Sequence, residues 1–176
     1  MKAKMTFLLL ALIVVLSGCA SKGPRPYVGP KSGPKATVNL FAPTIQSSAA
    51  NSEIDFEIFR ATANCSMESL GWVTLTPKGF NKPITVAAGV PFFVRLDYFQ
   101  TDIVLARNSR GEVKFVFVPA ENKTYTVEYK GTGTRFDMDI WEGSPKDGVQ
   151  GAKVVPLEWN VRNDKVLYRG ELNCKP

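Results

Sequence analysis

Apolar and polar residues alternate along most of this chain with a period of two. The longest runs lie at residues 54–58, 90–98, 113–117, 125–129, 136–140, 155–161 and 166–168, and shorter ones at 37–41, 72–76 and 84–87. Because successive side chains of a β-strand point to opposite faces of the sheet, each run predicts a strand with one face in a core. No segment keeps a 3.6-residue period over ten residues, so we expect little helix.

Turn-forming residues separate these runs. The turn signals are Ala88-Gly89, Asn108-Ser109-Arg110-Gly111, Gly131-Thr132-Gly133 and Gly143-Ser144-Pro145. Tyr98-Phe99-Gln100, which is flanked by Asp97 and Asp102, is interpreted as a loop tip. About eight or nine short strands in a single domain over residues 36–176 predict an all-β fold, which is either an antiparallel β-sandwich or a partly open barrel.

The stretch Ile84–Tyr129 resembles the immunoglobulin-like and transthyretin-like domains of bacterial surface and periplasmic proteins. In those domains an apolar-Ala-Gly turn feeds a long strand, and a later Tyr closes the sheet. The matching residues here are Ala88-Gly89 and Tyr125. The resemblance covers less than a third of the chain, and it implies a sandwich of this kind but no function.

The N-terminus has the pattern of a secretory signal. Lys2 and Lys4 precede an unbroken apolar run of ten residues, Phe7–Leu16, and the small residues Ser17 and Gly18 follow. Ten apolar residues form a helix of about 15 Å, which is half of the roughly 30 Å hydrocarbon core of a bilayer. This run therefore predicts a signal peptide and not a transmembrane span.

The sequence Leu16-Ser17-Gly18-Cys19 resembles the lipobox of bacterial lipoproteins. The resemblance implies that residues 1–18 are a cleaved signal peptide, and that Cys19 receives lipid on its sulfur and its new amino group. Ala20 and Ser21 resemble the sorting signal for the outer membrane, and more than one acyl chain gives stable anchoring. We expect an outer-membrane protein of residues 19–176 whose domain faces the periplasm or, alternatively, the cell exterior. An ordinary signal peptide with a chance cysteine is the other interpretation.

Residues 19–35 are expected to form a linker. Ala20–Lys35 contains four prolines and three Gly-Pro steps, which oppose both helix and sheet. Its four cations are Lys22, Arg25, Lys31 and Lys35, and it has no acidic residue. The segment is either a solvated spacer or a contact to anionic phospholipid or peptidoglycan.

The charge of the remaining chain is balanced. Six of the 22 basic residues lie before residue 36, which leaves 16 basic and 16 acidic residues in the expected domain. A domain without an excess of positive charge does not have the composition of a nucleic-acid-binding domain.

The chain has three cysteines. If Cys19 carries lipid, Cys65 and Cys174 remain, and outside the cytoplasm two cysteines usually form a disulfide. This bond would close a loop of more than 100 residues and would stabilise the fold by about 4–5 kcal/mol. Two free, buried thiols are the alternative.

Catalytic and metal-binding patterns are weak. The chain has no His, which excludes a Ser-His-Asp triad, a Cys-His pair and a His-ligated metal. Asp137, Asp139, Glu142 and Asp147 are clustered, but Trp141 takes the third acidic position of an EF-hand spacing, so we interpret them as a solvated face. No Gly-rich loop opens a helix, and no Ser has the nucleophile-elbow pattern. We expect no enzyme activity, no metal and no cofactor.

Nineteen aromatic residues make up 11% of the chain, and most should lie in the core. Trp141 falls on the polar face of its strand with Asp139, and Phe93 and Phe99 share the side of their strand that is opposite Tyr98. Trp141, Tyr98 and Phe99 are the candidate partner-binding residues, because aromatic residues are favoured in interface hot spots and in sugar stacking. Packing against a second sheet or the linker is the alternative.

These observations favour a non-enzymatic outer-membrane lipoprotein that acts as an accessory or scaffold and binds another envelope protein. Tethering to the membrane would raise its effective concentration near such a partner. A module that binds glycan or peptidoglycan is the second hypothesis, and a hydrolase is the third. An apolar surface patch would favour a protein partner, a groove with a stacking aromatic would favour a glycan, and acids converging in a pocket would favour an enzyme.

Overall fold

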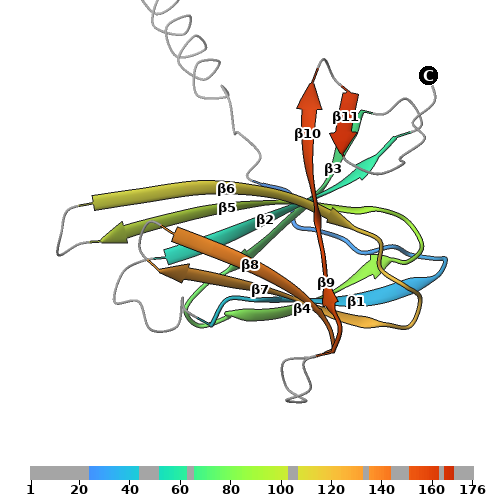
Figure 1. The fold of residues 1–176 in the computed structure, drawn as a ribbon, viewed down its shortest axis with the longest axis horizontal. Helices are drawn as coiled ribbons and strands as arrows, with labels where there is room; N and C mark the ends of the chain where they lie inside the picture. The colour runs from blue at the N-terminus through green and yellow to red at the C-terminus, as the bar shows by residue number, and fades with distance from the viewer. Residues whose placement is uncertain are drawn as a thin grey trace, which may run out of the picture.

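Two β-sheets packed face to face form the molecule (Figure 1). The computed structural model describes residues 24–43, 52–62, 66–102, 107–132, 135–143, 151–162 and 165–168, and within them the chain is all-β, with eleven strands. The predicted β-sandwich is therefore confirmed. The strands are β1 Lys35–Phe41, β2 Ser52–Ala61, β3 Met67–Leu75, β4 Asn81–Ala87, β5 Phe92–Asp102, β6 Arg107–Phe117, β7 Thr124–Thr132, β8 Arg135–Glu142, β9 Lys153–Val154, β10 Leu157–Arg162 and β11 Lys165–Tyr168.

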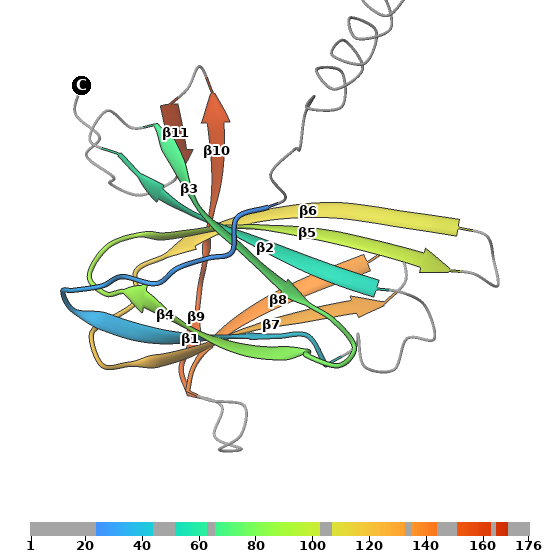
Figure 2. The ribbon, with the colours of Figure 1, turned by 180° about the vertical axis from the view of Figure 1, so that it is seen from behind.

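The five-stranded sheet has the order β4-β1-β7-β8-β9, and the six-stranded sheet has the order β11-β10-β6-β5-β2-β3. Neighbouring strands in the described residues pair antiparallel, except that β1 and β7 pair parallel. The β10–β11 hairpin projects away from the two layers, as Figures 1 and 2 show from opposite sides. Within the described part of the chain, no helix has the length and apolar character needed to span a bilayer.

The core lies between the two sheets and follows the alternation of the sequence. Val38 and Leu40 of β1, Phe56 of β2, Leu96 of β5 and Val127 of β7 are fully buried. Because residues two apart in a strand face the same side, each strand contributes its odd or its even set to this layer. Burial of these apolar side chains is the main contribution to stability.

Tyr125 joins the loop before β7 to the core. Its ring packs edge-on against Phe117, with centroids 5.2 Å apart, and its hydroxyl oxygen accepts a hydrogen bond of 3.0 Å from the amide of Ala120. Immunoglobulin-type sandwiches hold a corner of the sheet with the same kind of tyrosine contact to upstream backbone. At the other turn singled out by the sequence, Gly89 adopts φ = 74° between β4 and β5, a conformation that glycine reaches without strain.

Three sequence expectations are wrong in detail. Asn108–Gly111 is not a turn but part of β6, because the β5–β6 pairing runs without interruption from Phe92↔Phe117 to Asp102↔Arg107. The expected loop tip Tyr98–Gln100 therefore lies within β5. The run 155–161 is divided at Pro156, where the chain leaves the five-stranded sheet after β9 and enters the six-stranded sheet as β10.

Candidate partner-binding site

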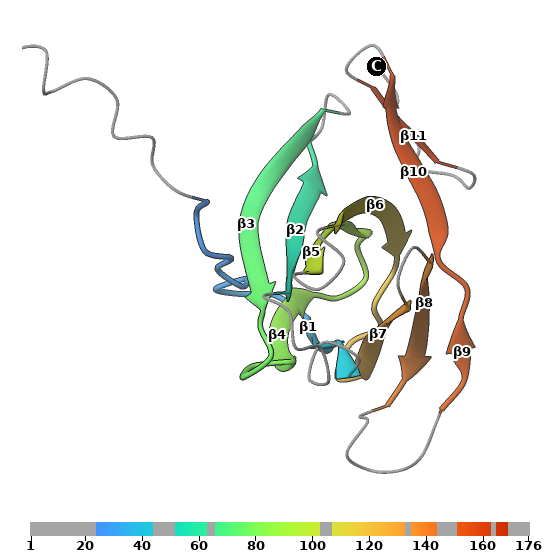
Figure 3. The ribbon, with the colours of Figure 1, turned by 90° about the vertical axis from the view of Figure 1, so that its left-hand side faces the viewer.

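The second half of the expected linker is bound to the sandwich. We call residues Arg25–Pro30 the strap. The amide of Trp72 on β3 donates to the Arg25 carbonyl (2.8 Å), and the amide of Tyr27 donates to the Trp72 carbonyl (2.9 Å). The Tyr27 hydroxyl donates to the Thr85 carbonyl of β4 (2.9 Å). The strap thus joins β3 to β4, which are edge strands of the two sheets, and it lies beside β3 in Figure 3. The expectation of a free spacer over residues 19–35 is wrong for this part.

Two glycines permit this close approach. A Cβ atom on Gly71 would lie 2.7 Å from backbone atoms of Arg25 and Pro26, and Gly71 has φ = 126°. A Cβ atom on Gly29 would lie 2.8 Å from the Thr85 carbonyl oxygen. Any other residue at these positions would push the strap away from the edge strands. Burial of the strap also raises the pKa of Tyr27 to about 12, because its anionic form would lose water.

An apolar groove of about 300 Å³ lies between the strap and the end of the sandwich. The residues that line it come from the strap, from the ends of β2 and β4, from β3, from the β4–β5 connection and from the start of β5. They are Tyr27, Val28, Gly29, Pro30, Phe59, Arg60, Leu70, Ala87, Val90, Pro91 and Phe92. We call this feature the strap groove.

Two valines on the strap groove are exposed to solvent. Val28 of the strap is 61% exposed and Val90 of the β4–β5 connection is 49% exposed. Arg60, which forms an ion pair with Glu68 on β3 (2.7 Å), is the charged residue of the lining. An apolar hollow whose rim keeps large aliphatic side chains in water is typical of a binding surface.

The structure does not bring the three predicted aromatic residues together. Tyr98 is 6% exposed and lies in the core, where its ring contacts that of Tyr129 with centroids 5.5 Å apart. Its assignment as a partner-binding residue is therefore wrong, because its side chain faces the opposite sheet. Phe93 is fully buried in a second small cluster with Val116. Phe99 lies in β5, but its side chain is outside the described part of the structure.

Trp141 lies on the outer face of the five-stranded sheet, between Thr126 of β7 and Lys153 of β9 in register. Its side chain is half-buried, and the Lys153 ammonium lies 5.4 Å from the ring centroid. The buried indole nitrogen has no hydrogen-bond partner among the described residues. Trp141 thus has the orientation that the sequence predicts, but lysine covers the ring face that a sugar would use.

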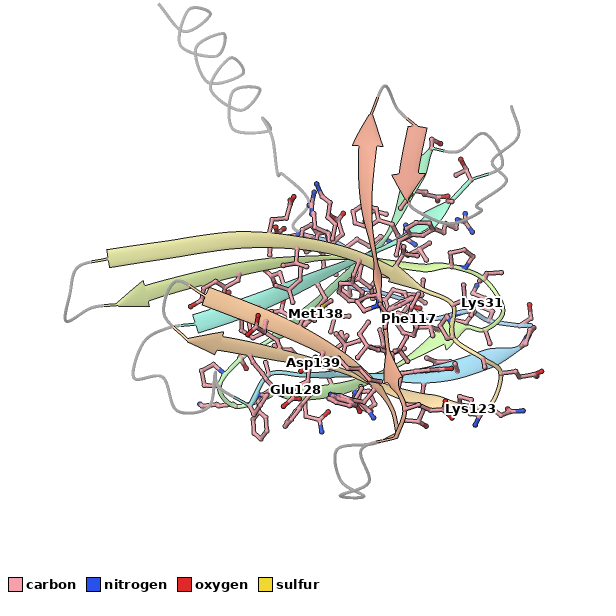
Figure 4. All side chains as sticks on the ribbon, in the orientation of Figure 1. Lys31, Phe117, Lys123, Glu128, Met138 and Asp139 are labelled. Atoms are coloured by element: carbon pink, nitrogen blue, oxygen red, sulfur yellow. The ribbon has the colours of Figure 1, made fainter. Side chains whose placement is uncertain are left out.

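Two carboxylates of the same sheet, Asp139 and Glu128, are paired with lysines. Asp139 forms ion pairs with Lys153 (2.6 Å) and Lys130 (3.3 Å), and Glu128 forms one with Lys130 (3.0 Å). Figure 4 shows Asp139 and Glu128 near each other on neighbouring strands. The hydrogen bond from Lys153 is the main reason that the pKa of Asp139 is lowered. Among the described side chains, no group of three or more acidic or cysteine residues is placed to hold a metal.

A second, open cavity of about 370 Å³ lies where β7 and β8 approach the start of β9. Glu142 is the carboxylate in its lining, and it is paired with Lys123 (2.6 Å). Neither this cavity nor the strap groove brings two acids together. Cys19, Cys65 and Cys174 lie outside the described residues, so the predicted lipidation and disulfide remain predictions.

Comparison of this chain with protein-family models, with curated proteins and with solved structures finds no match.

Sequence reasoning missed the strap groove, although one signal points to it. Tyr27 and Val28 are large side chains in a segment otherwise made of small, charged or proline residues. A fully solvated spacer gains no stability from large apolar side chains. Their presence indicates that this part of the segment packs against something.

Proposed function

We propose that this protein is an outer-membrane lipoprotein, anchored through Cys19, that binds another envelope protein through the strap groove and has no enzymatic role. The observation that carries the proposal is the groove itself, an apolar hollow of about 300 Å³ with Val28 and Val90 exposed on its rim. Such a surface gains free energy when an apolar segment of a partner removes it from water.

The position of the strap groove supports this function. The strap begins at Arg25, six residues after Cys19, and six residues span at most about 20 Å. A lipid on Cys19 would therefore hold the groove close to the membrane surface. Confinement at this distance favours a partner that is itself embedded in or attached to the outer membrane.

The proposed partner site can be tested by photo-crosslinking in intact cells. A photoreactive amino acid at position 28 or 90 should give a discrete adduct with a second protein. The matched control position is Val155, which is also exposed, at 79%, but lies outside the groove. Adducts of equal yield at all three positions, or at none, would contradict the proposed site.

A charge substitution tests whether the groove is the binding surface. Val90→Asp should remove the adduct formed from position 28, because a buried carboxylate opposes an apolar contact, whereas Val155→Asp should leave it unchanged. Both variants should keep the melting temperature of the parent, since both side chains are half-exposed or more.

The anchor is tested separately. Cys19→Ser should abolish lipid labelling and leave the protein unprocessed or soluble. If the Cys19→Ser protein still fractionates with the outer membrane at mature size, the proposed anchoring is wrong.

A further inference from the structure

The described lysine and arginine side chains fall into two classes. Arg60, Arg95, Lys114, Lys123, Lys130 and Lys153 each form an ion pair with a carboxylate. The remaining ones form no ion pair with a described carboxylate, and all of them are exposed. They are Arg25, Lys31, Lys35, Lys78 and Lys82.

These five cations lie along one side of the sandwich, which we call the basic edge. Arg25 belongs to the strap and Lys31 follows it directly, while Lys35 begins β1. Lys78 lies in the turn between β3 and β4, and Lys82 lies in β4. The strap connects β3 and β4, which are edge strands of the two sheets, and Lys35 lies beside the end of β4 in register with Ala87. The five cations therefore belong to β3, β4 and the segments next to them, and Figure 3 shows these two strands opposite β9 and β10.

Acidic residues are nearly absent from the segments that form the basic edge. Residues 24–43 and 66–91 contain Glu68 as their one acid, and its carboxylate is paired with Arg60 of β2. Among the described side chains, every other lysine and arginine is paired with a carboxylate, so a row of five cations without an ion pair is a local feature. Such a row of positive charges would attract an anionic surface outside this chain.

We infer that the basic edge rests on the anionic phospholipid of the membrane that holds the anchor. The inference rests on the proposed lipidation of Cys19, because Pro24, where the described chain begins, is five residues from that position. Five residues reach at most about 18 Å, so a lipid on Cys19 would hold Pro24, which directly precedes Arg25 of the basic edge, within that distance of the headgroups.

The chemistry of the edge fits a lipid surface better than a folded acidic partner. Lysine ammonium groups bind as point charges, and each cation near an anionic bilayer contributes about a fivefold gain in binding.

Sedimentation with phospholipid vesicles tests this contact without the anchor. The chain from residue 19 to 176 carrying Cys19→Ser should bind vesicles that contain phosphatidylglycerol and not vesicles of phosphatidylcholine alone, and salt should weaken the binding. The triple variant Lys31→Gln, Lys78→Gln, Lys82→Gln should lower binding by up to about 100-fold, at about fivefold for each cation. None of these three lysines forms an ion pair with a described carboxylate, so a thermal melt should show an intact fold.

The matched control removes the same charge from strands that lie outside the basic edge. Lys114→Gln, Lys130→Gln, Lys153→Gln, which change residues of β6, β7 and β9, should reduce vesicle binding less than fivefold. Equal losses from the two triple variants, or no preference for anionic vesicles, would overturn the inference. In cells, a photoreactive residue at position 82 should attach to lipid, and a protein adduct there would overturn it as well.

The two proposals fail in distinguishable ways. The vesicle assay uses a chain without lipid, so its result does not depend on processing at Cys19. Loss of anchoring in cells together with intact vesicle binding would refute the anchor alone, whereas normal anchoring without vesicle binding would refute the membrane contact alone.

Discussion

Tyr27 is the side chain that fastens the strap, and its removal should release the strap while the sandwich stays folded. The ring is half-buried, and the hydroxyl donates to the Thr85 carbonyl at 2.9 Å. Truncation of a fully buried aromatic residue to Ala costs about 3–5 kcal/mol. With half of that burial, Tyr27→Ala should lower the free energy of unfolding by about 2 kcal/mol.

Tyr27→Phe separates the hydrogen bond from the packing. One hydrogen bond contributes about 0.5–1.5 kcal/mol net, and Thr85 is exposed on an edge strand, so its carbonyl regains water and the cost should be near the lower limit. At about 2–4 °C for each kcal/mol in a chain of this size, Tyr27→Phe should lower the melting temperature by about 1–2 °C and Tyr27→Ala by about 4–8 °C. Val28→Ala, at an exposed position of the same strap, should change stability by less than about 0.5 kcal/mol.

Amide hydrogen exchange identifies the strap as the cause. The amides of Tyr27 and Trp72 both bond across the strap–β3 contact, so both should exchange slowly in the parent protein. In Tyr27→Ala the amide of Trp72 should exchange rapidly, while amides of the central strands keep their protection. A protected Trp72 amide and an unchanged melting temperature in Tyr27→Ala would refute the reasoning that Tyr27 holds the strap.

Three further predictions concern Tyr27, Trp141 and the two cysteines of the expected domain. Burial raises the pKa of Tyr27 from 10.0 to about 12. The stability that the neutral phenol contributes is therefore complete below pH 10 and is lost as the pH rises towards 12. In denaturation experiments at a series of alkaline pH values, Tyr27→Phe should lose less of its free energy of unfolding than the parent protein. Trp141→Ala should lower the free energy of unfolding by about 1.5–2.5 kcal/mol, because the indole is half-buried. It should leave the crosslinks formed from the strap groove intact. A stability within about 0.5 kcal/mol of the parent, together with loss of the adduct, would instead show that Trp141 belongs to the partner-binding surface. Cys65 and Cys174 should be disulfide-bonded, and two alkylated cysteines in the mass spectrum of the unreduced protein would contradict this.

The strands could be predicted from the sequence because a strand with one face in the core must alternate apolar and polar residues. Val94 and Leu96 are fully buried, as their spacing indicates. The same alternation places Tyr98 with them, and Tyr98 is buried because the period of the strand, and not the flanking aspartates, determines which side its ring faces. Likewise, Asn108–Gly111 has turn residues, but pairing along the full length of β5 overrides local preference.

The strap and its groove could not be predicted in the same way. Prolines and glycines show that residues 24–30 lack helix or long strand of their own, yet they say nothing about docking onto another part of the fold. The contacts of the strap join Arg25 to Trp72 and Tyr27 to Thr85, which are far apart in the chain. Only the sheet order, which makes β3 and β4 edge strands, creates the place where the strap binds.

The parallel pairing of β1 with β7 has a consequence for the order of folding. It places Val38 beside Tyr125 and Leu40 beside Val127 at the interior of the five-stranded sheet. One edge of β1 therefore has no partner strand until β7 is available. During synthesis from the N-terminus, β1 can pair early with β4 alone, and its other edge stays open until β7 has been made. Chains that stop before β7 should therefore expose an apolar strand edge and aggregate, whereas the complete chain closes it.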